Sequence, residues 1–179
     1  MVTKHGLTVE EYLALPEEKP YAEYINGEVS PKMAPDRNHA GIAGELNYRL
    51  GLYRRQRGGF FGPEGRVMFT GAGDIRFLLP DVGYWAEGRA VGDRVLTPPT
   101  LAIEIRSVDQ SLDQLREKCR YYRTHGVDVC WLIDPVTRLV EVFESDVDGV
   151  IMGPGGVLES PRLPGLQIVL GELFAVLGD

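Results

Sequence analysis

The sequence is poor in cysteine, and the two cysteines it has are not spaced for a shared task. Cys119 and Cys130 form neither a C-x-x-C pair nor a framework of paired cysteines. Disulfide-rich extracellular domains and cysteine-ligated zinc sites are therefore not indicated. Both residues lie among apolar neighbours, where a cysteine packs as a small hydrophobic side chain. We expect a reducing, cytoplasmic environment.

Long hydrophobic runs are missing as well. The longest apolar runs are far shorter than the roughly 20 residues that a helix needs to span a bilayer. The first residues, MVTKHGLTVEEY, contain no apolar core like that of a signal peptide. The sequence therefore predicts a protein without a membrane segment.

The fingerprints of several common enzyme classes are also absent. The chain contains no G-x-S-x-G turn, no H-E-x-x-H helix, and neither a G-x-x-x-x-G-K-[ST] nor a G-x-G-x-x-G loop. The sequence therefore gives no support for a serine hydrolase of the nucleophile-elbow type, a zinc protease or a common nucleotide-binding fold. We expect no nucleotide cofactor.

Basic residues are scarce towards the C-terminus. Residues 139–179 contain one basic residue against seven acidic ones, and the net charge of the chain is −7. An acidic balance argues against tight nucleic-acid binding over a broad surface, because such binding depends on neutralising phosphates. The net negative charge does not exclude a local basic groove that binds nucleic acid.

The patterns that are present predict a mixed α/β fold. Helical patterns cover residues 8–16, 38–56, 111–126 and 171–178, a hairpin signal covers 24–29, and strand patterns cover 60–70, 75–85, 101–106, 127–134 and 138–145. This order predicts an α/β (α+β) domain with a central mixed sheet flanked by helices, rather than a doubly wound dinucleotide fold. We expect residues 1–179 to form a single domain, with a core at about 38–145 and an N-terminal helix and β-hairpin extension.

Two carboxylates interrupt otherwise apolar strands. Glu104 lies within LAIEIRS (101–107), and Asp81 follows Pro80 within FLLPDVGYW (77–85). An uncompensated carboxylate in such a strand costs on the order of several kcal/mol. If the strands are neighbours, the two carboxylates converge and need a cation or a shared proton between them. A hard ion such as Mg²⁺ suits such a site, held by carboxylates, a backbone carbonyl and waters.

A lysine on the next helix can complete this site. Lys118 borders the apolar stripe of its helix, because it follows Leu115 by three residues and precedes Tyr122 by four. From that position its ammonium can reach back towards Glu104. Arg106 cannot lose its proton, so it can hold a phosphate but cannot act as a base.

At these residues the chain resembles the PD-(D/E)XK nuclease superfamily with a migrated lysine. More closely, it resembles the Uma-two family of restriction-endonuclease-like proteins, and the likeness covers almost the whole chain. The segments that carry it are TVEEYLALPE (8–17), AEYINGEV (22–29), His39 at a helix start, PDVGYW (80–85), IEIRS (103–107), SLDQLREKCRYYRTHGVDVCWLIDP (111–135) and RLPGLQIVL (162–170).

The resemblance implies a restriction-endonuclease-like fold and Mg²⁺- or Mn²⁺-dependent hydrolysis of DNA. Asp81 and Glu104 would be the metal ligands, together with the backbone carbonyl of Ile105, and Lys118 would be the catalytic lysine. The chain departs from the pattern at Arg106, which stands where the superfamily has its usual lysine. It departs again at 107–108, where Ser-Val replaces the Ser-Pro of the family.

Other interpretations of these residues stay open. Glu104 can instead form a structural ion pair with Arg106 or Arg76. Glu28, beside the hairpin turn, and His39, at a helix start, are candidate accessory residues together with Arg106, although a solvated charge and a packing histidine are the simpler interpretations. Glu23 precedes the same turn, and a solvated charge is the simpler interpretation there as well, with a role in the site as the alternative. The whole chain can also be a non-catalytic binding or regulatory module that keeps the nuclease fold.

The sequence also suggests self-association. The segments LPGLQIVL (163–170) and ELFAVL (172–177) are rich in apolar residues. Together they offer more apolar surface than a single small sheet is expected to cover. Cutting both strands of a duplex needs two active sites or two binding events, which a two-fold dimer supplies. We therefore expect a homodimer that acts on DNA.

Overall fold

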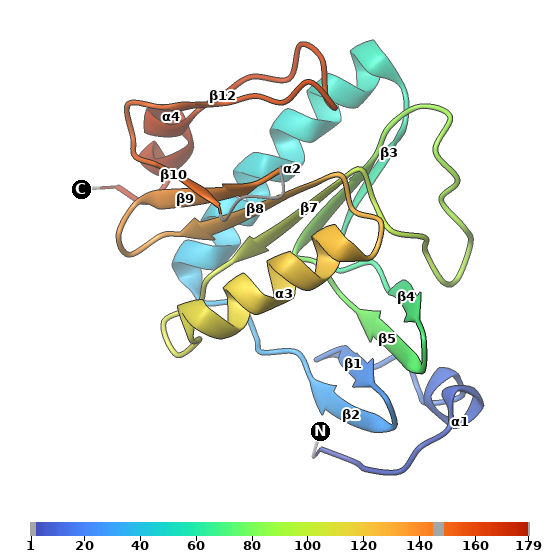
Figure 1. The fold of residues 1–179 in the computed structure, drawn as a ribbon. Helices are drawn as coiled ribbons and strands as arrows, with labels where there is room; N and C mark the ends of the chain where they lie inside the picture. Colours follow the sequence, from blue (N-terminus) through green and yellow to red (C-terminus); the bar gives the residue numbers. More distant parts are fainter. Residues whose placement is uncertain (1–2, 145–148, 179) are drawn as a thin grey trace.

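The computed structural model describes residues 3–144 and 149–178, and a six-stranded mixed sheet lies at its centre (Figure 1). The strand order is β10-β9-β8-β7-β6-β3; β7 and β8 run parallel, and the other neighbours run antiparallel. The strands are β3 (Phe60–Pro63), β6 (Val82–Trp85), β7 (Leu101–Ile105), β8 (Val129–Asp134), β9 (Leu139–Phe143) and β10 (Val150–Met152). The predicted α+β architecture with a central mixed sheet is confirmed. Ser145, the last residue of the predicted strand 138–145, lies outside the described residues.

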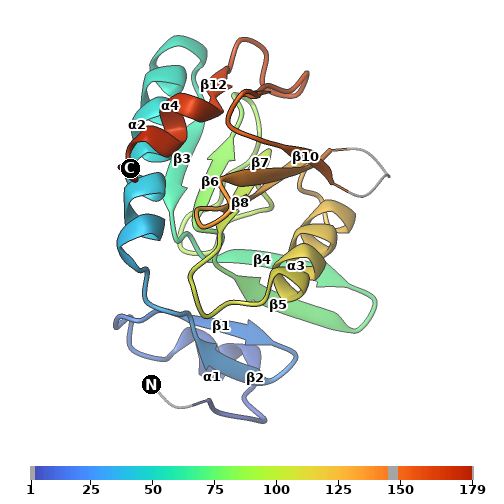
Figure 2. The ribbon, with the colours of Figure 1, turned by 90° about the vertical axis from the view of Figure 1, so that its left-hand side faces the viewer.

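Helices cover both faces of this sheet (Figure 2). Helix α2 (Arg37–Arg57) packs on one face through Ile42, Leu46 and Leu50, which recur at helical spacing and are fully buried. Helix α3 (Leu112–Thr124) packs on the other face and connects the parallel strands β7 and β8. Its stripe of Leu115, Cys119 and Tyr122 is buried as its spacing predicts.

Helix α2 begins at Arg37, one residue before the predicted start at residue 38. Asp36 caps it, because the Asp36 side chain accepts a hydrogen bond from the His39 backbone N–H at 2.9 Å. The second carboxylate oxygen of Asp36 accepts from the N–H of Val108 at 3.2 Å. One side chain therefore joins the start of α2 to the loop that follows β7.

The hairpin of the N-terminal extension pairs with a second hairpin, β4–β5, to form a second sheet below the first one in Figure 1. Its strand order is β2-β1-β5-β4, with β1 (Ala22–Ile25), β2 (Glu28–Pro31), β4 (Val67–Gly71) and β5 (Asp74–Leu78). The predicted hairpin is present, and both turn residues, Asn26 and Gly27, have positive φ angles of 47° and 95°. The predicted first helix is α1 (Val9–Leu13), where Thr8 and Glu11 form a capping box.

The prediction of one long strand at 60–70 and another at 75–85 is wrong, because each segment divides between the two sheets. The segment 60–70 gives β3 and β4, and the break falls at Glu64, whose φ of 49° is foreign to a strand. The segment 75–85 gives β5 and β6, and the break includes Pro80, which has no N–H to donate to a ladder. Asp81 follows directly, at the junction of the two sheets.

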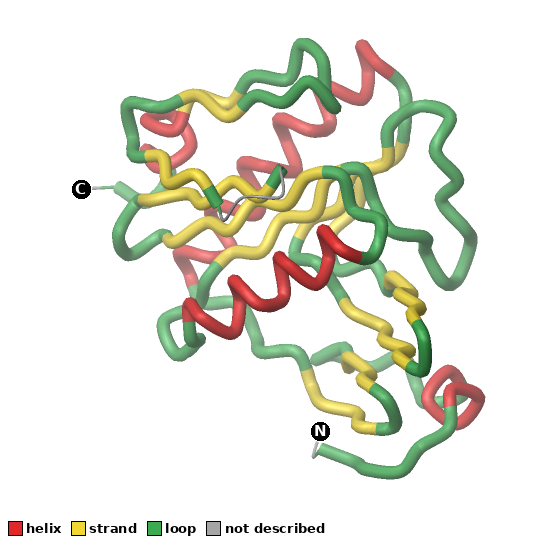
Figure 3. Tube along the Cα trace, in the orientation of Figure 1, coloured by secondary structure: helices red, strands yellow, loops and turns green. Residues whose placement is uncertain are grey.

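The C-terminal residues return over the α2 side of the central sheet. They form β11 (Val157–Leu158), β12 (Ile168–Val169) and α4 (Leu170–Ala175), joined by the loops that Figure 3 traces at the top of the view. The last helix is shorter than the predicted 171–178. Within the described residues, no helix is long and apolar enough to cross a membrane.

Candidate active site

Asp81 and Glu104 lie at the same end of neighbouring strands. Strands β6 and β7 are antiparallel, with Val82 opposite Ile103. Asp81 precedes β6 directly, and its Oδ2 accepts a hydrogen bond from the Ile105 N–H at 2.6 Å. The two carboxyl residues are 4% and 2% exposed, so each needs partners inside the protein.

The partners of Glu104 come from helix α3. Its Oε1 lies 3.1 Å from the Lys118 ammonium nitrogen and accepts a hydrogen bond from the Tyr122 hydroxyl at 2.7 Å. The predicted approach of Lys118 to Glu104 is therefore present in the structure. The ion pairs with Arg106 or Arg76 that the sequence left open are not formed: Arg106 pairs with Asp134, and Arg76 pairs with Asp74.

Lys118 also connects the core to the N-terminal extension. Its Nζ donates to Oε1 of Glu23, a residue of β1, at 2.7 Å. The same Glu23 oxygen accepts from the backbone N–H of Leu79, just before the junction that holds Asp81, at 2.9 Å. Glu23 thus fixes both the catalytic-lysine candidate and the strand end that carries the first carboxylate.

Asp81 is held by two further side chains. Lys32, which follows β2, places its Nζ 2.6 Å from Oδ1 of Asp81, and His39 of α2 places its Nε2 3.1 Å from Oδ2. The Lys32 side chain is only 10% exposed, and its Nζ also donates to the Leu79 carbonyl at 2.6 Å. His39 Nδ1 is buried and has no hydrogen-bond partner among the described residues.

The charges shift the pKa values of these groups in different directions. Burial alone would raise the pKa of Asp81, but the charge of Lys32 and the hydrogen bond from His39 outweigh it and hold that pKa below its usual range. Burial raises the pKa of Glu104, which Lys118 opposes and the charge of Asp81 reinforces. Burial alone would lower the pKa of Lys118, but its two carboxylate neighbours raise it above the usual value. At neutral pH the Lys118 ammonium is therefore charged.

The donor atoms of the cluster are chemically suited to a hard divalent cation, because carboxyl oxygens dominate among them. Asp81, Glu104 and Glu23 supply three carboxyl groups, whereas Lys32 and Lys118 supply two ammonium groups. Carboxylate oxygens are the ligands that Mg²⁺ prefers. No group of three or more His, Cys, Asp or Glu side chains among the described residues has metal-binding geometry. An ion would rely on two carboxylates and a backbone carbonyl, and Lys32 would have to leave Asp81.

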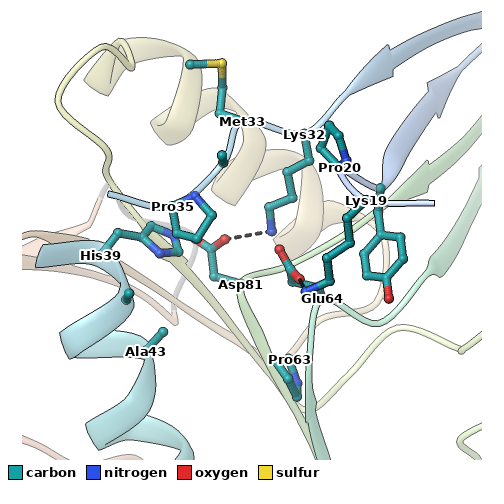
Figure 4. A pocket seen from close by; sticks show the side chains of 13 residues that line it. Lys19, Pro20, Lys32, Met33, Pro35, His39, Ala43, Pro63, Glu64 and Asp81 are labelled. Carbon is teal, nitrogen blue, oxygen red and sulfur yellow. Dashed lines mark ion pairs between the residues drawn. The ribbon is translucent and has the colours of Figure 1, made fainter. Parts of the chain in front are cut away.

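A cavity of about 520 Å³ opens beside Asp81. Figure 4 shows the Asp81 carboxylate between His39 and Glu64, with the Lys32 ammonium directed at it. Glu104 is not among the residues that line the cavity. A ligand entering from solvent would therefore meet Asp81 and Lys32 before Glu104.

Two predicted accessory residues are placed elsewhere. The Glu28 side chain is 57% exposed and lies 3.9 Å from His5 at the surface of the extension. Arg106 donates to Asp134 at 3.1 Å and to the Gln110 carbonyl at 3.1 Å, so its guanidinium supports the loop after β7. The third accessory candidate, His39, does join Asp81.

Three members of the cluster were not among the predicted site residues: Glu23, Lys32 and Tyr122. Tyr122 follows Lys118 by four residues, so helical spacing places both side chains on the same face of α3. This spacing could have predicted that Tyr122 lies near the site. Glu23 alternates with the buried Ala22 and Tyr24 in β1, so its side chain is expected on the opposite face of the hairpin. The alternation does not predict which residues cover that face.

Comparisons with known proteins bear on the family and the fold of the chain. The chain is similar to a protein from Anabaena variabilis ATCC 29413, described as "a putative nuclease belonging to DUF820", whose crystal structure is known. The two share 26% sequence identity and a TM-score of 0.82, over 96% of this chain and 99% of the other. A search of the curated proteins found no match. The model of the Uma2 family, described as "Putative restriction endonuclease", matches residues 9–172, and the chain therefore belongs to that family.

Proposed function

We propose that this protein is a DNA endonuclease that depends on Mg²⁺ or Mn²⁺. The observation that carries the proposal is a pair of buried carboxylates on neighbouring strands, Asp81 and Glu104, with a buried lysine against one of them. Membership of a restriction-endonuclease family supports a nuclease. The carboxylates and the Ile105 carbonyl would hold the ion.

Each residue has a defined task in this proposal. A bound ion would polarise the phosphate and lower the pKa of a coordinated water. Lys118 keeps its proton, so it acts as an ammonium that orients the attacking water or stabilises the charge developing on the phosphate. Tyr122 and Glu23 fix the positions of Glu104 and Lys118. His39 orients Asp81.

Cleavage of labelled DNA tests this proposal, with Glu104→Gln as the matched variant. Glutamine keeps the size of the side chain and the hydrogen bond with Tyr122 but loses the negative charge. We expect Mg²⁺-dependent cleavage by the wild type, none in EDTA, and a loss of at least about a hundredfold in the variant, since a missing charge-stabilising group typically has this effect. Cleavage by Glu104→Gln at the wild-type rate would contradict the proposal.

One observation favours a second candidate, a non-catalytic binding or regulatory module. Asp81 already has an ammonium, an imidazole and a backbone N–H as partners, so this carboxylate is satisfied without a metal ion. Calorimetric titration with Mn²⁺ separates the two candidates. Binding that disappears in Glu104→Ala favours the enzyme, and a wild type that binds no Mn²⁺ at millimolar concentration favours the module.

We also propose that the active form is a homodimer of single-domain chains, located in the cytoplasm. The site takes residues from both the extension and the core, as expected if residues 1–179 form one domain. The edge strand β10 exposes Val150 and Ile151 by 64% and 59%. An exposed apolar edge strand readily pairs with another chain.

A further inference from the structure

The cavity beside Asp81 offers more than a metal and a phosphate need. Its volume of about 520 Å³ lies within the range of about 300–1,000 Å³ that is typical of pockets for small organic ligands. Most of its exposed lining is apolar, and the side chains that supply it include Tyr21, Met33, Pro35, Ala40, Ala43 and Pro63. A phosphate would gain nothing from contact with such a wall.

The polar groups of the cavity mark where a phosphate would lie. Lys32 and Asp81 meet at one part of the lining, 2.6 Å apart. Lys19 lines the cavity as well; its side chain is 74% exposed and lies 3.6 Å from Glu64. A phosphate that reaches Asp81 from solvent therefore carries its nucleoside past a cationic side chain and against the apolar wall.

The bases of an intact duplex cannot reach this wall. They are paired and stacked inside the double helix, and an enzyme contacts the face of a base only after the base has left the stack. Aromatic and apolar side chains accept unstacked bases of any sequence. Tyr21 and Met33 are side chains of this kind.

We propose that the cavity holds one unpaired nucleotide of the DNA strand, with its base against Tyr21, Met33 and Pro35 and its phosphate towards Asp81 and Lys32. This inference rests on the proposed nuclease function and names its substrate class. The protein selects single strands, flaps or unpaired nucleotides over intact duplex. Electrostatics alone favours the duplex, because its charge density is higher, so the opposite preference requires a binding site for the base.

Binding to three labelled oligonucleotides tests the inference: a 20-mer duplex, the same duplex with one unpaired nucleotide, and the single strand. Fluorescence anisotropy is measured with Ca²⁺ in place of Mg²⁺. We expect the two substrates with unpaired bases to bind at least tenfold more tightly than the duplex. Equal or tighter binding of the duplex would overturn the inference.

A cavity-filling variant assigns the preference to this cavity. Ala40 is exposed on α2 and lines the cavity, so Ala40→Trp fills the space without disturbing the core. Gly44→Trp is the control, because Gly44 is exposed on the same helix and a Cβ added there meets no atom within 4 Å. We expect Ala40→Trp to reduce the preference to less than twofold and Gly44→Trp to keep it. An unchanged preference in Ala40→Trp would overturn the assignment.

Cleavage in Mg²⁺ distinguishes failure of this inference from failure of the proposed function. If the wild type cleaves all three substrates at the same rate, the nuclease stands and the unpaired-nucleotide site is wrong. If it neither binds nor cleaves any of them, the nuclease proposal falls and this inference falls with it.

Discussion

The cluster around Asp81 and Glu104 concentrates charge where folding alone does not require it. Its five charged side chains come from five separate segments, and each is at least four-fifths buried. A buried ion-pair network is often no more stabilising than apolar residues of the same volume. Burial of this kind is instead typical of functional sites, where perturbed pKa values gather.

Exchanging the two basic residues separately tests which of them serves catalysis. We expect Lys118→Met to lower the cleavage rate by at least about a hundredfold, because it removes the ammonium beside Glu104. Arg106→Met should stay close to the wild-type rate, since Arg106 contacts Asp134 and Gln110 instead of the cluster. Circular dichroism and melting temperature verify that both variants fold. The reverse order of rates would mean that Arg106 fills the lysine role of the superfamily.

Lys32 is an internal counter-ion of Asp81, which an ion bound at the proposed metal site would displace. Lys32→Met should destabilise the metal-free protein by about 3 kcal/mol, because breaking a buried pair leaves a buried charge with fewer partners. Mn²⁺ should raise the melting temperature of this variant by more than that of the wild type, since the ion no longer competes with the ammonium. Lys19→Met is the control, because Lys19 lines the same cavity but pairs with Glu64. Equal Mn²⁺ shifts in all three proteins would contradict direct competition.

Some of these residues could be predicted from the sequence and others could not. Asp81 and Glu104 are conspicuous because a carboxylate inside an apolar strand is costly. Lys32 and Glu23 belong to a hairpin, where charged residues are common and usually solvated. Their burial depends on how the hairpin docks against the junction near Asp81, which the local pattern does not contain.

At the scale of elements, the site depends on two strand breaks that the hydrophobic pattern hides. Residues 60–70 and 75–85 each look like one strand, yet each divides between the two sheets. The break at Pro80 lets the chain leave the second sheet and enter the central one, with Asp81 at the crossing. Pattern alone cannot predict such a division, because apolar alternation continues on both sides of the break.

The cap of α2 is a testable part of this arrangement. Asp36→Ala should lower the free energy of unfolding by about 1–2 kcal/mol, as expected for the loss of an N-cap. Asp36→Asn should lose much less at neutral pH, because asparagine caps about as well. Urea unfolding followed by circular dichroism measures both variants. A smaller loss in the alanine variant than in the asparagine variant would contradict the capping role.

The same residue gives a pH dependence with a defined sign. Hydrogen bonds from the backbone N–H groups of His39 and Val108 hold the pKa of Asp36 below its usual value, although burial opposes them. A depressed pKa contributes stability that is present above the unfolded-state value of about 3.9 and is lost as the pH falls through the folded-state value. The wild type should therefore lose stability relative to Asp36→Asn below about pH 4. A constant difference from pH 3 to pH 7 would contradict this.

At the scale of the whole molecule, the extension is part of the site and not an appendage. Glu23 and Lys32 come from its hairpin, whereas Asp81, Glu104 and Lys118 come from the junction and the core. Any movement of the extension would therefore change the surroundings of both carboxylates. The extension itself was predictable, because its capping and turn signals are local, but its part in the site was not.

Light scattering at micromolar concentration tests the proposed homodimer. We expect a mass near twice 19.9 kDa, whereas a mass near 19.9 kDa would contradict a stable dimer. Ile151→Lys places a charge on the exposed edge strand β10 and should shift the protein towards the monomer if that edge forms the interface. A dimer that persists unchanged in this variant would point to another face.

Nicking of a supercoiled plasmid by the purified protein tests the central claim most directly. The wild type and Asp81→Ala, purified in parallel, are compared with Mg²⁺, with Mn²⁺ and with EDTA. Asp81→Ala removes a buried carboxylate that accepts from Ile105 and pairs with Lys32. We predict metal-dependent nicking by the wild type and none by a folded Asp81→Ala. Equal nicking by both proteins would contradict the assignment of this cluster as a nuclease site, and so would a wild type that, with either metal, cleaves neither the plasmid nor the single-stranded oligonucleotide.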